Sequence, residues 1–334
     1  MNFTLLAIES SCDETAAAVI QNGKILSNII ATQSIHQKYG GIVPELASRA
    51  HQQNIVPAVA QALLQANITK YMLNGVAFTK GPGLLGSLLV GVSFAKAFAL
   101  GLNVPLIEVN HMEAHILAHF IDDTKPSFPF LCLTVSGGHT QIVLVTDYLK
   151  MEVIGQTQDD AVGEAFDKSA KLLGLPYPGG PLVDKYAQLG NPHAYAFPNV
   201  DTPALNYSFS GIKTAILYFL RDKTAKEPDF VEKNMNDICA SIQEALIEIL
   251  LKKLRKAVNE TGIKEVAIAG GVSANSGLRK RLQENADKLG WNVYIPRFEY
   301  CTDNAAMIAM AGAFKYERGI FADQQVSPDP RMKI

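Results

Sequence analysis

The sequence predicts an α/β protein of two similar lobes that face each other across a cleft. Short apolar strands alternate with helical segments along the chain. A strand, a hydroxyl-rich turn and a second strand occupy residues 3–20, and the same unit returns at residues 130–146. Two copies of one unit, roughly 125 residues apart, indicate an internal duplication. With 334 residues and 48% hydrophobic content, the chain is long enough to bury two cores.

The composition of the chain limits the classes of protein to which it can belong. The net charge of −2 and the pI near 6.4 carry no general signal for nucleic acid, although a basic groove can exist within a neutral total. The four cysteines form no CxxC pair and are typical of a reduced, cytosolic protein: Cys12, Cys132, Cys239 and Cys301. The N-terminus lacks the basic segment of a signal peptide. The longest apolar stretch, residues 84–109, contains Lys96 and Pro105, which favours a buried helix and strand over a membrane span. We therefore expect a soluble, cytoplasmic protein without a membrane partner.

Two turns near the N-terminus can carry ligands. Residues 9–15 (Glu-Ser-Ser-Cys-Asp-Glu-Thr) separate two apolar strands, and Asp13 and Glu14 can hold a cation or a polar substrate. A polar β-turn without a ligand is the alternative. Residues 80–87 (Lys-Gly-Pro-Gly-Leu-Leu-Gly-Ser) follow a later strand and lead into a helix. This glycine-rich turn can present N–H groups to an anion or simply allow tight packing, and it lacks the pattern of a Walker loop.

Two histidines at helical spacing are the strongest chemical signal. His111 and His115 follow an apolar strand, and residues four apart on a helix lie on the same face. Both imidazoles can therefore reach one metal ion, or the pair can be two helix-face histidines without a metal. The motif is not that of a zinc peptidase, because Glu113 lies on the opposite side of the helix. His119 leaves the ligand assignment ambiguous, and Asp303 is either a third ligand or the N-cap of the helix that follows it.

The second copy of the duplicated unit also has a ligand-like turn, residues 136–140 (Ser-Gly-Gly-His-Thr). Two such turns that face each other can bind a polyphosphate or an acyl phosphate from both sides. Residues 155–260 then read as helices and loops, and this insertion is the natural place for substrate specificity. Residues 264–269 form another strand, followed by two glycines and Asn275. Asn275 can bond a ribose or a base, or the segment can be a plain strand–helix turn.

These motifs together resemble one known family. The chain is similar to the TsaD (Gcp/YgjD) family, the tRNA N6-adenosine threonylcarbamoyltransferases. The departures from its pattern are Lys80, where arginine is common, and Ala305, where glycine is common, and neither is a proposed ligand. The matching stretches follow the family's order over nearly the whole chain: residues 9–15, 80–84, 110–115, 136–140, 160–168, 177–181, 208–214, 270–275 and 301–304.

The resemblance implies a two-lobed actin-like ATPase fold, shared by acetate and sugar kinases, heat-shock ATPases and actin. This fold agrees with the duplicated unit. We expect residues 1–110 to form the first lobe, with a C-terminal helix at about 305–334 packing back on it. We expect residues 111–304 to form the second lobe, including the helical insertion at about 155–260.

The resemblance also implies the reaction. A threonylcarbamoyl group passes from threonylcarbamoyl-AMP to N6 of adenosine 37 in tRNAs that read codons starting with A, and AMP leaves. The implied cofactors are one divalent metal, iron or zinc, and an adenine nucleotide. The implied partners are tRNA, a TsaB-like paralogous subunit and a TsaE-like small ATPase.

The resemblance also implies roles for individual residues, where these match the family's motifs. The implied metal ligands are His111, His115 and Asp303, which decides against His119. Asp13 and Glu14 are implied to be polar groups near the transfer centre. As a hypothesis of mechanism, we expect a carboxylate such as one of these two to take the proton of the amine. The implied substrate and nucleotide contacts are Thr134, Val135, Ser136, Gly137, Gly138, Asp167, Gly180, Asp184 and Asn275.

Three alternatives remain at this point. A small-molecule kinase of the acetate or sugar type would use the same cleft to transfer phosphate. A metallopeptidase would use the paired histidines, although Glu113 is misplaced for its base. A non-catalytic actin-like ATPase would not need the two histidines.

Overall fold

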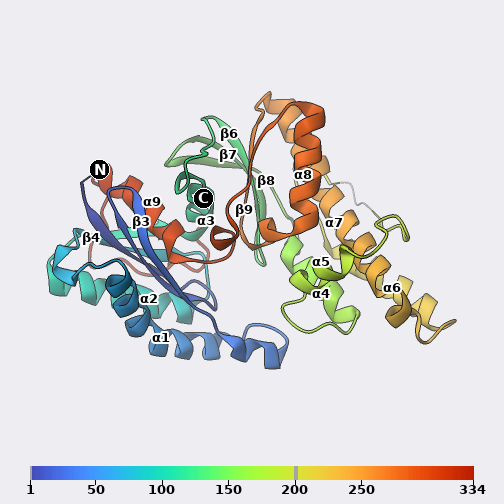
Figure 1. Cartoon of the computed structure of the whole chain (residues 1–334), viewed down its shortest axis with the longest axis horizontal. Coiled ribbons are helices and arrows are strands. Elements are labelled where there is room, and N and C mark those ends of the chain that lie inside the picture. The colour runs from blue at the N-terminus through green and yellow to red at the C-terminus, as the bar shows by residue number, and fades with distance from the viewer. Residues whose placement is uncertain (1, 199–201) are drawn as a thin grey trace. The chain divides into compact units, whose positions relative to one another are not determined.

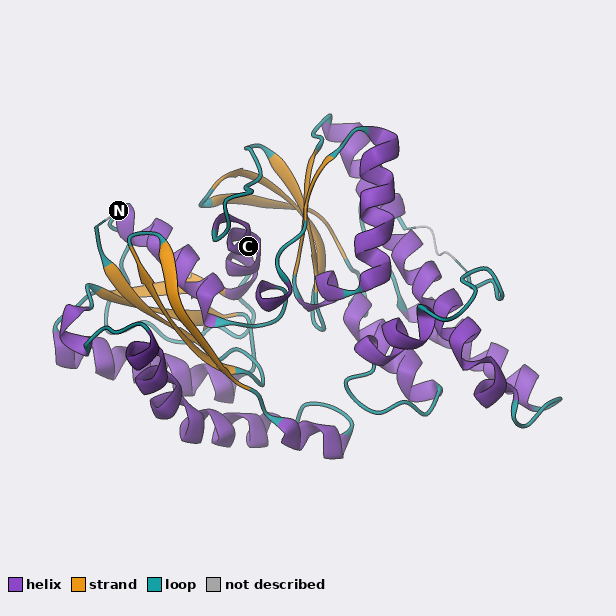
Figure 2. Cartoon of the chain, in the orientation of Figure 1, coloured by secondary structure: helices purple, strands orange, loops and turns teal. Residues whose placement is uncertain are grey.

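Two five-stranded sheets with the same strand order form the framework of the chain (Figure 1, Figure 2). In the first sheet, ordered β3-β2-β1-β4-β5, β1 is antiparallel to β2 and parallel to β4. In the second sheet, ordered β8-β7-β6-β9-β10, β6 is antiparallel to β7 and parallel to β9. The predicted duplication is therefore confirmed at the level of sheet topology. The strands are β1 Thr4–Glu9, β2 Thr15–Gln21, β3 Lys24–Ala31, β4 Gly75–Gly81, β5 Leu106–Asn110, β6 Phe130–Val135, β7 Thr140–Asp147, β8 Lys150–Gln156, β9 Glu265–Ala269 and β10 Asn292–Tyr294.

This computed structural model describes residues 2–198 and 202–334, and the chain divides into two units. The first unit comprises Met1–Lys125, Asp147–Met151 and Pro296–Ile334, and the second comprises Pro126–Thr146 and Glu152–Ile295. The boundary thus differs from the one expected at residue 110. Residues 111–125 and 296–304 belong to the first unit because the helix after β5 packs against the C-terminal helix.

Helices cover both faces of the first sheet. Helices α1 (Pro44–Gln65) and α2 (Leu85–Leu102) pack on one face, where they bury alternate residues of the strands, such as Leu6 and Phe78. Helix α9 (Ala305–Glu317) packs on the opposite face and contacts all five strands (Figure 1). Its small side chains allow this close approach, since a Cβ atom on Gly312 would lie 2.6 Å from Ala77.

Short elements complete the first unit. They are α3 His111–Leu117 and the 3₁₀ turns η1 Ser34–Tyr39, η2 Lys70–Met72, η3 Ala118–Phe120 and η5 Phe298–Tyr300. The segment after α9 runs along the ends of β4 and β5, where the Asp329 N–H donates to the Lys80 carbonyl at 2.8 Å. One helix in the described part of the chain, α2, is long and apolar enough to cross a membrane by length and composition. It packs against α1 and β4.

The second unit contains the helical insertion. Its helices are α4 Val162–Leu172, α5 Gly180–Ala187, α6 Ser210–Thr224, α7 Phe230–Thr261 and α8 Ser276–Leu289, with the 3₁₀ turn η4 Gly271–Ala274. Four of them, α4 to α7, lie between β8 and β9 in the sequence, where the insertion is predicted. Their apolar faces join Leu131, Leu133 and Ile142 of the sheet in one core.

Candidate active site

Helix α3 presents both predicted histidines at the carboxyl end of β5. The Asn110 side chain ends the strand and starts the helix, because its oxygen accepts hydrogen bonds from the N–H groups of Met112 and Glu113. His111 and His115 are four positions apart on this helix, and their ring centroids lie 4.7 Å apart. The helical spacing predicted from sequence therefore brings the two imidazoles together.

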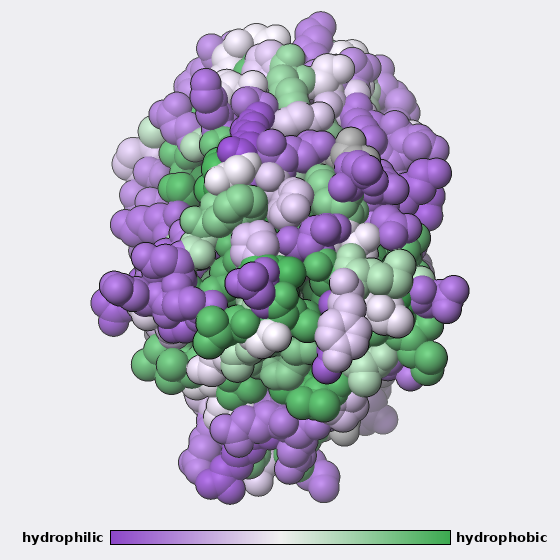
Figure 3. Space-filling model, turned by 90° about the vertical axis from the view of Figure 1, so that its left-hand side faces the viewer, coloured by the Kyte–Doolittle hydropathy of each residue, from purple (hydrophilic) through white to green (hydrophobic). Residues whose placement is uncertain are grey.

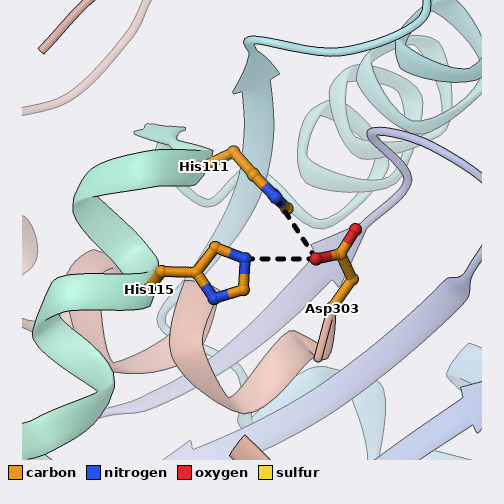
Figure 4. A group of neighbouring side chains, drawn as sticks. All are labelled: His111, His115 and Asp303. Atoms are coloured by element: carbon orange, nitrogen blue, oxygen red, sulfur yellow. Dashed lines mark hydrogen bonds and ion pairs between the residues drawn. The ribbon is translucent and has the colours of Figure 1, made fainter. Parts of the chain in front are cut away.

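Asp303 completes a group of three ligand atoms (Figure 4). Its Oδ1 lies 3.4 Å from His111 Nε2 and 3.1 Å from His115 Nε2. The N-cap of α9 is Asn304, whose side chain accepts from Met307 N, so the alternative role of Asp303 as that cap is wrong. The three atoms lie within 4.8 Å of one another, and in the described part of the chain no other group of three or more metal-ligand side chains, with or without His119, forms such a cluster.

Glu9 orients His111, a role that was not predicted from the sequence. It is the last residue of β1 and is fully buried. Its Oε2 lies 3.0 Å from His111 Nδ1 and accepts from Thr79 Oγ1 at 2.6 Å, while its Oε1 accepts from Ser11 N at 2.5 Å. In the sequence, the signal for such a role is a charged residue at the end of an apolar strand. A charged residue at this position is also common where a strand leads into an ordinary turn.

The hydrogen bond between His111 and Glu9 makes the His111–His115–Asp303 group suitable for binding a cation. A carboxylate can only accept a hydrogen bond, so His111 Nδ1 carries the proton. If the imidazole ring is neutral, its Nε2 then carries a lone pair, and this lone pair points toward the Asp303 carboxylate. Two acceptors at 3.4 Å repel each other unless a positive charge lies between them. Two imidazole nitrogens and one carboxylate form a donor set that suits iron or zinc.

A proton supplies that positive charge in the metal-free protein. Burial lowers the pKa of His111, but the charges of Glu9 and Asp303 outweigh it, so this pKa lies well above its usual range. Burial would raise the pKa of Asp303, yet the charge of His111 holds it well below its usual range. The surrounding carboxylates thus favour any cation at this position.

Asp13 and Glu14 lie in the turn between β1 and β2, and both are half-buried. Burial and the negative charges of Asp303 and Asp13 raise the pKa of Glu14 to about 9. The Ser11 hydroxyl of the same turn lies 3.2 Å from His111 Nδ1, so the turn lies near the His111–His115–Asp303 group. With a pKa of about 9, Glu14 is protonated at neutral pH in the absence of a metal ion, and a cation bound at the group would favour its charged form.

Replacing Glu9 with glutamine is expected to weaken metal binding by roughly 10- to 100-fold, the usual effect of losing a carboxylate that orients a metal-ligating histidine. Glutamine keeps the shape of the side chain but cannot accept from His111, Thr79 and Ser11 at once. Metal affinity is measured by competition with a chelator. Glu108→Gln is the control, because Glu108 lies in β5 and its carboxylate pairs with half-buried Lys80 instead of a histidine. Equal affinities in the two variants would refute the role of Glu9.

The predicted nucleotide contacts lie in the second unit. Thr134 and Val135 are buried in β6, and the turn from Ser136 to Gly138 follows them. Ser136 N is bonded to the His139 carbonyl at 2.8 Å. Within residues 2–198 and 202–334, the N–H groups of Gly137 and Gly138 have no hydrogen-bond partner, and both glycines are exposed. These two N–H groups are the ones free to bind a phosphate.

The remaining predicted contacts connect the helices around this turn. The Asp167 carboxylate accepts from the N–H groups of Gly179 and Gly180 at 2.8 and 3.0 Å. Asp184 accepts from Ser276 N and Oγ at 3.0 and 2.7 Å. Because these carboxylates join α4 to α5 and α5 to α8, they hold the backbone of both glycine-containing loops in place.

Asn275 also has a structural role. Its oxygen caps α8 by accepting from Leu278 N at 2.9 Å, and its amide donates to Gln243 at 2.7 Å. Gly270, with φ at +88°, begins the same loop, and a Cβ atom there would lie 2.5 Å from the Val135 carbonyl. The loop of Asn275 therefore packs against the end of β6, next to the Ser136 turn.

Solved structures show the class of fold. HypF from T. kodakarensis aligns with a TM-score of 0.62 at 15% identity, covering 97% of this chain and 49% of that one. Component A of the (R)-2-hydroxyglutaryl-CoA dehydratase from Acidaminococcus fermentans aligns with a TM-score of 0.53 at 16% identity, covering 95% and 99%. The chain has the actin-like ATPase fold of these proteins, as predicted.

Sequence comparisons then show the family. The family model of tRNA N6-adenosine threonylcarbamoyltransferase (TsaD) matches residues 24–310. The curated protein of that name from Cytophaga hutchinsonii is 70% identical, and the match covers 100% of this chain and 97% of that protein. The one from Thermosipho africanus is 47% identical, covering 99% of both. The chain belongs to the TsaD family.

Proposed function

We propose that this chain transfers the threonylcarbamoyl group of threonylcarbamoyl-AMP to N6 of adenosine 37 in tRNAs that read codons starting with A. The observation that carries the proposal is the His111–His115–Asp303 group, oriented by Glu9, in a chain of this family. N6 attacks the carbonyl carbon of the donor, the bond from that carbon to the phosphate oxygen breaks, and AMP leaves with the electron pair. The proton lost by N6 goes to a base of the enzyme.

The two substrates define what the side chains must do. N6 of adenosine is a poor nucleophile because its lone pair is delocalised into the ring, whereas the donor is an activated mixed anhydride. Catalysis therefore depends on positioning and on stabilising negative charge. His111, His115 and Asp303 hold the divalent ion, iron or zinc, which supplies Lewis-acid stabilisation when bound. Asp13 or Glu14, beside this group, accepts the proton of N6.

The second unit binds the adenine nucleotide. The N–H groups of Gly137 and Gly138 are the proposed donors to the phosphate, because they have no partner among the described residues and both glycines are exposed. The loop that ends at Asn275 and the Asp167–Gly180 contact shape the surroundings of this turn. Since the acceptor is tRNA, the enzyme works in the cytoplasm.

Mass spectrometry of tRNA nucleosides tests the function. Purified chain, synthetic threonylcarbamoyl-AMP and unmodified tRNA are incubated, and the tRNA is digested. The expected product is threonylcarbamoyladenosine at position 37, with AMP released in equal amount. A tRNA with guanosine at position 37 is the matched control and should gain no mass. Substrate-dependent ADP formation without tRNA would point to a kinase instead.

An exposed apolar surface supports the proposed partner subunit. Large apolar side chains of α1, α2 and η2 are exposed on the first unit, and Figure 3 shows a hydrophobic area on this side. An apolar area of this kind on a helix pair is typical of a protein interface. A TsaB-like paralogue with the same fold would present an equivalent helix pair, so that the two pairs pack together. A TsaE-like ATPase joins this complex. The surface consists of Val56, Leu64, Tyr71, Met72, Leu85, Leu89 and Leu100.

Replacing Leu89 with aspartate is expected to weaken binding of the paralogous subunit at least 10-fold, because a charge would be buried in an apolar interface. The measurement is calorimetric titration of the chain with that subunit. Leu289→Asp is the control, since Leu289 is 43% exposed and Leu89 is 46% exposed, but Leu289 lies in α8. Unchanged binding by Leu89→Asp would contradict the proposed interface, and loss of a homodimer in this variant would assign the surface to a second copy of the chain.

A further inference from the structure

His51 is a fully buried histidine that the mechanism above does not use. It lies in α1, and both of its ring nitrogens contact the turn that carries Asp13 and Glu14. Nε2 lies 3.0 Å from the Cys12 carbonyl oxygen, and Nδ1 lies 2.7 Å from Thr15 Oγ1. A carbonyl only accepts, so Nε2 carries the proton. Burial lowers the pKa of His51, which leaves Nδ1 to accept from the Thr15 hydroxyl.

Helix α2 and the residue before it also contact this turn. The Ser87 hydroxyl donates to the Cys12 carbonyl at 3.0 Å, so this oxygen accepts from both helices. The Leu84 N–H donates to the Ser11 carbonyl at 2.7 Å. The two carbonyl groups that precede Asp13 in the chain are therefore both held by donors from outside the turn.

Glycines before and within α2 make these contacts possible. A Cβ atom on Gly83 would lie 2.4 Å from the Ser11 carbonyl oxygen, and one on Gly91 would lie 2.0 Å from Ser10 Oγ. The Gly83 N–H donates to the Pro330 carbonyl at 3.3 Å, and the Leu84 N–H to Ser11. These N–H groups are thus occupied. At Gly83 and Leu84 the structure shows tight packing, which is one of the two roles predicted for this segment.

We propose that His51 and Ser87 are positioning residues, which direct Asp13 and Glu14 toward the His111–His115–Asp303 group by holding the Cys12 carbonyl from two helices. This inference rests on the proposed function, in which one of the two carboxylates accepts the proton of N6. Proton transfer requires hydrogen-bond distance between base and acceptor, so a small displacement of the turn slows the chemical step. We expect binding of tRNA, of the donor and of the metal to stay unchanged when these two hydrogen bonds are lost.

The test compares His51→Phe and Ser87→Ala with the matched control Ser27→Ala. Ser27 is also buried, and its hydroxyl donates to a backbone carbonyl of α1, that of Ala62, at 2.8 Å, away from the turn. Both test variants are expected to lower kcat for transfer about 10-fold or more, with unchanged KM for the donor and unchanged metal content. Amide hydrogen exchange of residues 12–15 is expected to accelerate in both. Ser27→Ala should change neither kcat nor the exchange rate of residues 12–15.

Conservative and steric variants complete the design. His51→Gln keeps a donor for the Cys12 carbonyl and should restore kcat relative to His51→Phe. Gly91→Ala adds a methyl group against Ser10 and should lower kcat, whereas Gly101→Ala in the same helix adds it where no atom lies within 4 Å and should not. Full kcat and unchanged exchange in Ser87→Ala and Gly91→Ala would overturn the inference. If the unmodified chain lacks transfer activity, the proposed function fails, and the exchange measurement still tests the positioning of the turn.

Discussion

Replacing Asp303 with alanine is expected to remove the bound metal and to lower threonylcarbamoyl transfer by roughly two to four orders of magnitude, because the metal contributes several kcal/mol to stabilising the transition state. Asp303 supplies the only carboxylate of the three ligand atoms, at 3.1 Å from His115 Nε2 and 3.4 Å from His111 Nε2. Without it, two neutral imidazoles remain, which hold a divalent ion far more weakly than the complete set.

Metal content of the purified variant, determined by mass spectrometry, is compared with its transfer rate. Asp123→Ala is the matched control, since Asp123 is an exposed aspartate of the same unit. It should keep both metal and activity. Full activity of Asp303→Ala with no bound metal would exclude a catalytic role for the metal, and full metal content would exclude Asp303 as a ligand.

Neutralising the catalytic base is expected to lower kcat by roughly 100- to 10,000-fold, the usual contribution of a positioned general base. Asp13→Asn and Glu14→Gln each replace a carboxyl group with an amide of the same shape, which cannot take up the proton of N6. The two carboxylates are not equivalent, because burial and the charges of Asp303 and Asp13 raise the pKa of Glu14 to about 9. The variant with the larger loss identifies the base.

Single-turnover transfer with saturating donor separates this effect from binding. Metal content should stay close to that of the unmodified chain in both variants, since neither residue belongs to the ligand group. The control is Asp323→Asn, which changes an aspartate of the C-terminal segment in the same unit. If both test variants retain full kcat, the proton of N6 goes to another group.

The fold was predictable because the duplication has a local signature. A strand, a polar turn and a strand can be recognised in residues 3–20 and 130–146 without knowledge of the rest of the chain. The unit boundary was not predictable in this way. Residues 111–125 follow a strand of the first sheet, and their place in the first unit depends on α3 packing against α9, which begins at Ala305.

The metal group was only partly predictable from local pattern. The spacing of His111 and His115 brings two rings to one helix face, but it also suits histidines without a metal. Asp303 is distant in sequence, and only the resemblance to a family selected it over its role as an N-cap. Asn304 occupies that cap, which explains why Asp303 is available to the histidines. Glu9 was missed because a buried carboxylate is recognised by its partners, and these come from β4 and α3.

The most direct test of the account follows metal content and transfer in one titration. Metal is removed from the chain with a chelator, iron or zinc is added back in steps, and threonylcarbamoyladenosine in tRNA is measured at each step. We predict that activity rises in proportion to bound metal, saturates at one ion per chain, and stays at background in Asp303→Ala. Full transfer by the metal-free chain, or no modified tRNA at full metal occupancy, would contradict the proposal that this site performs the reaction.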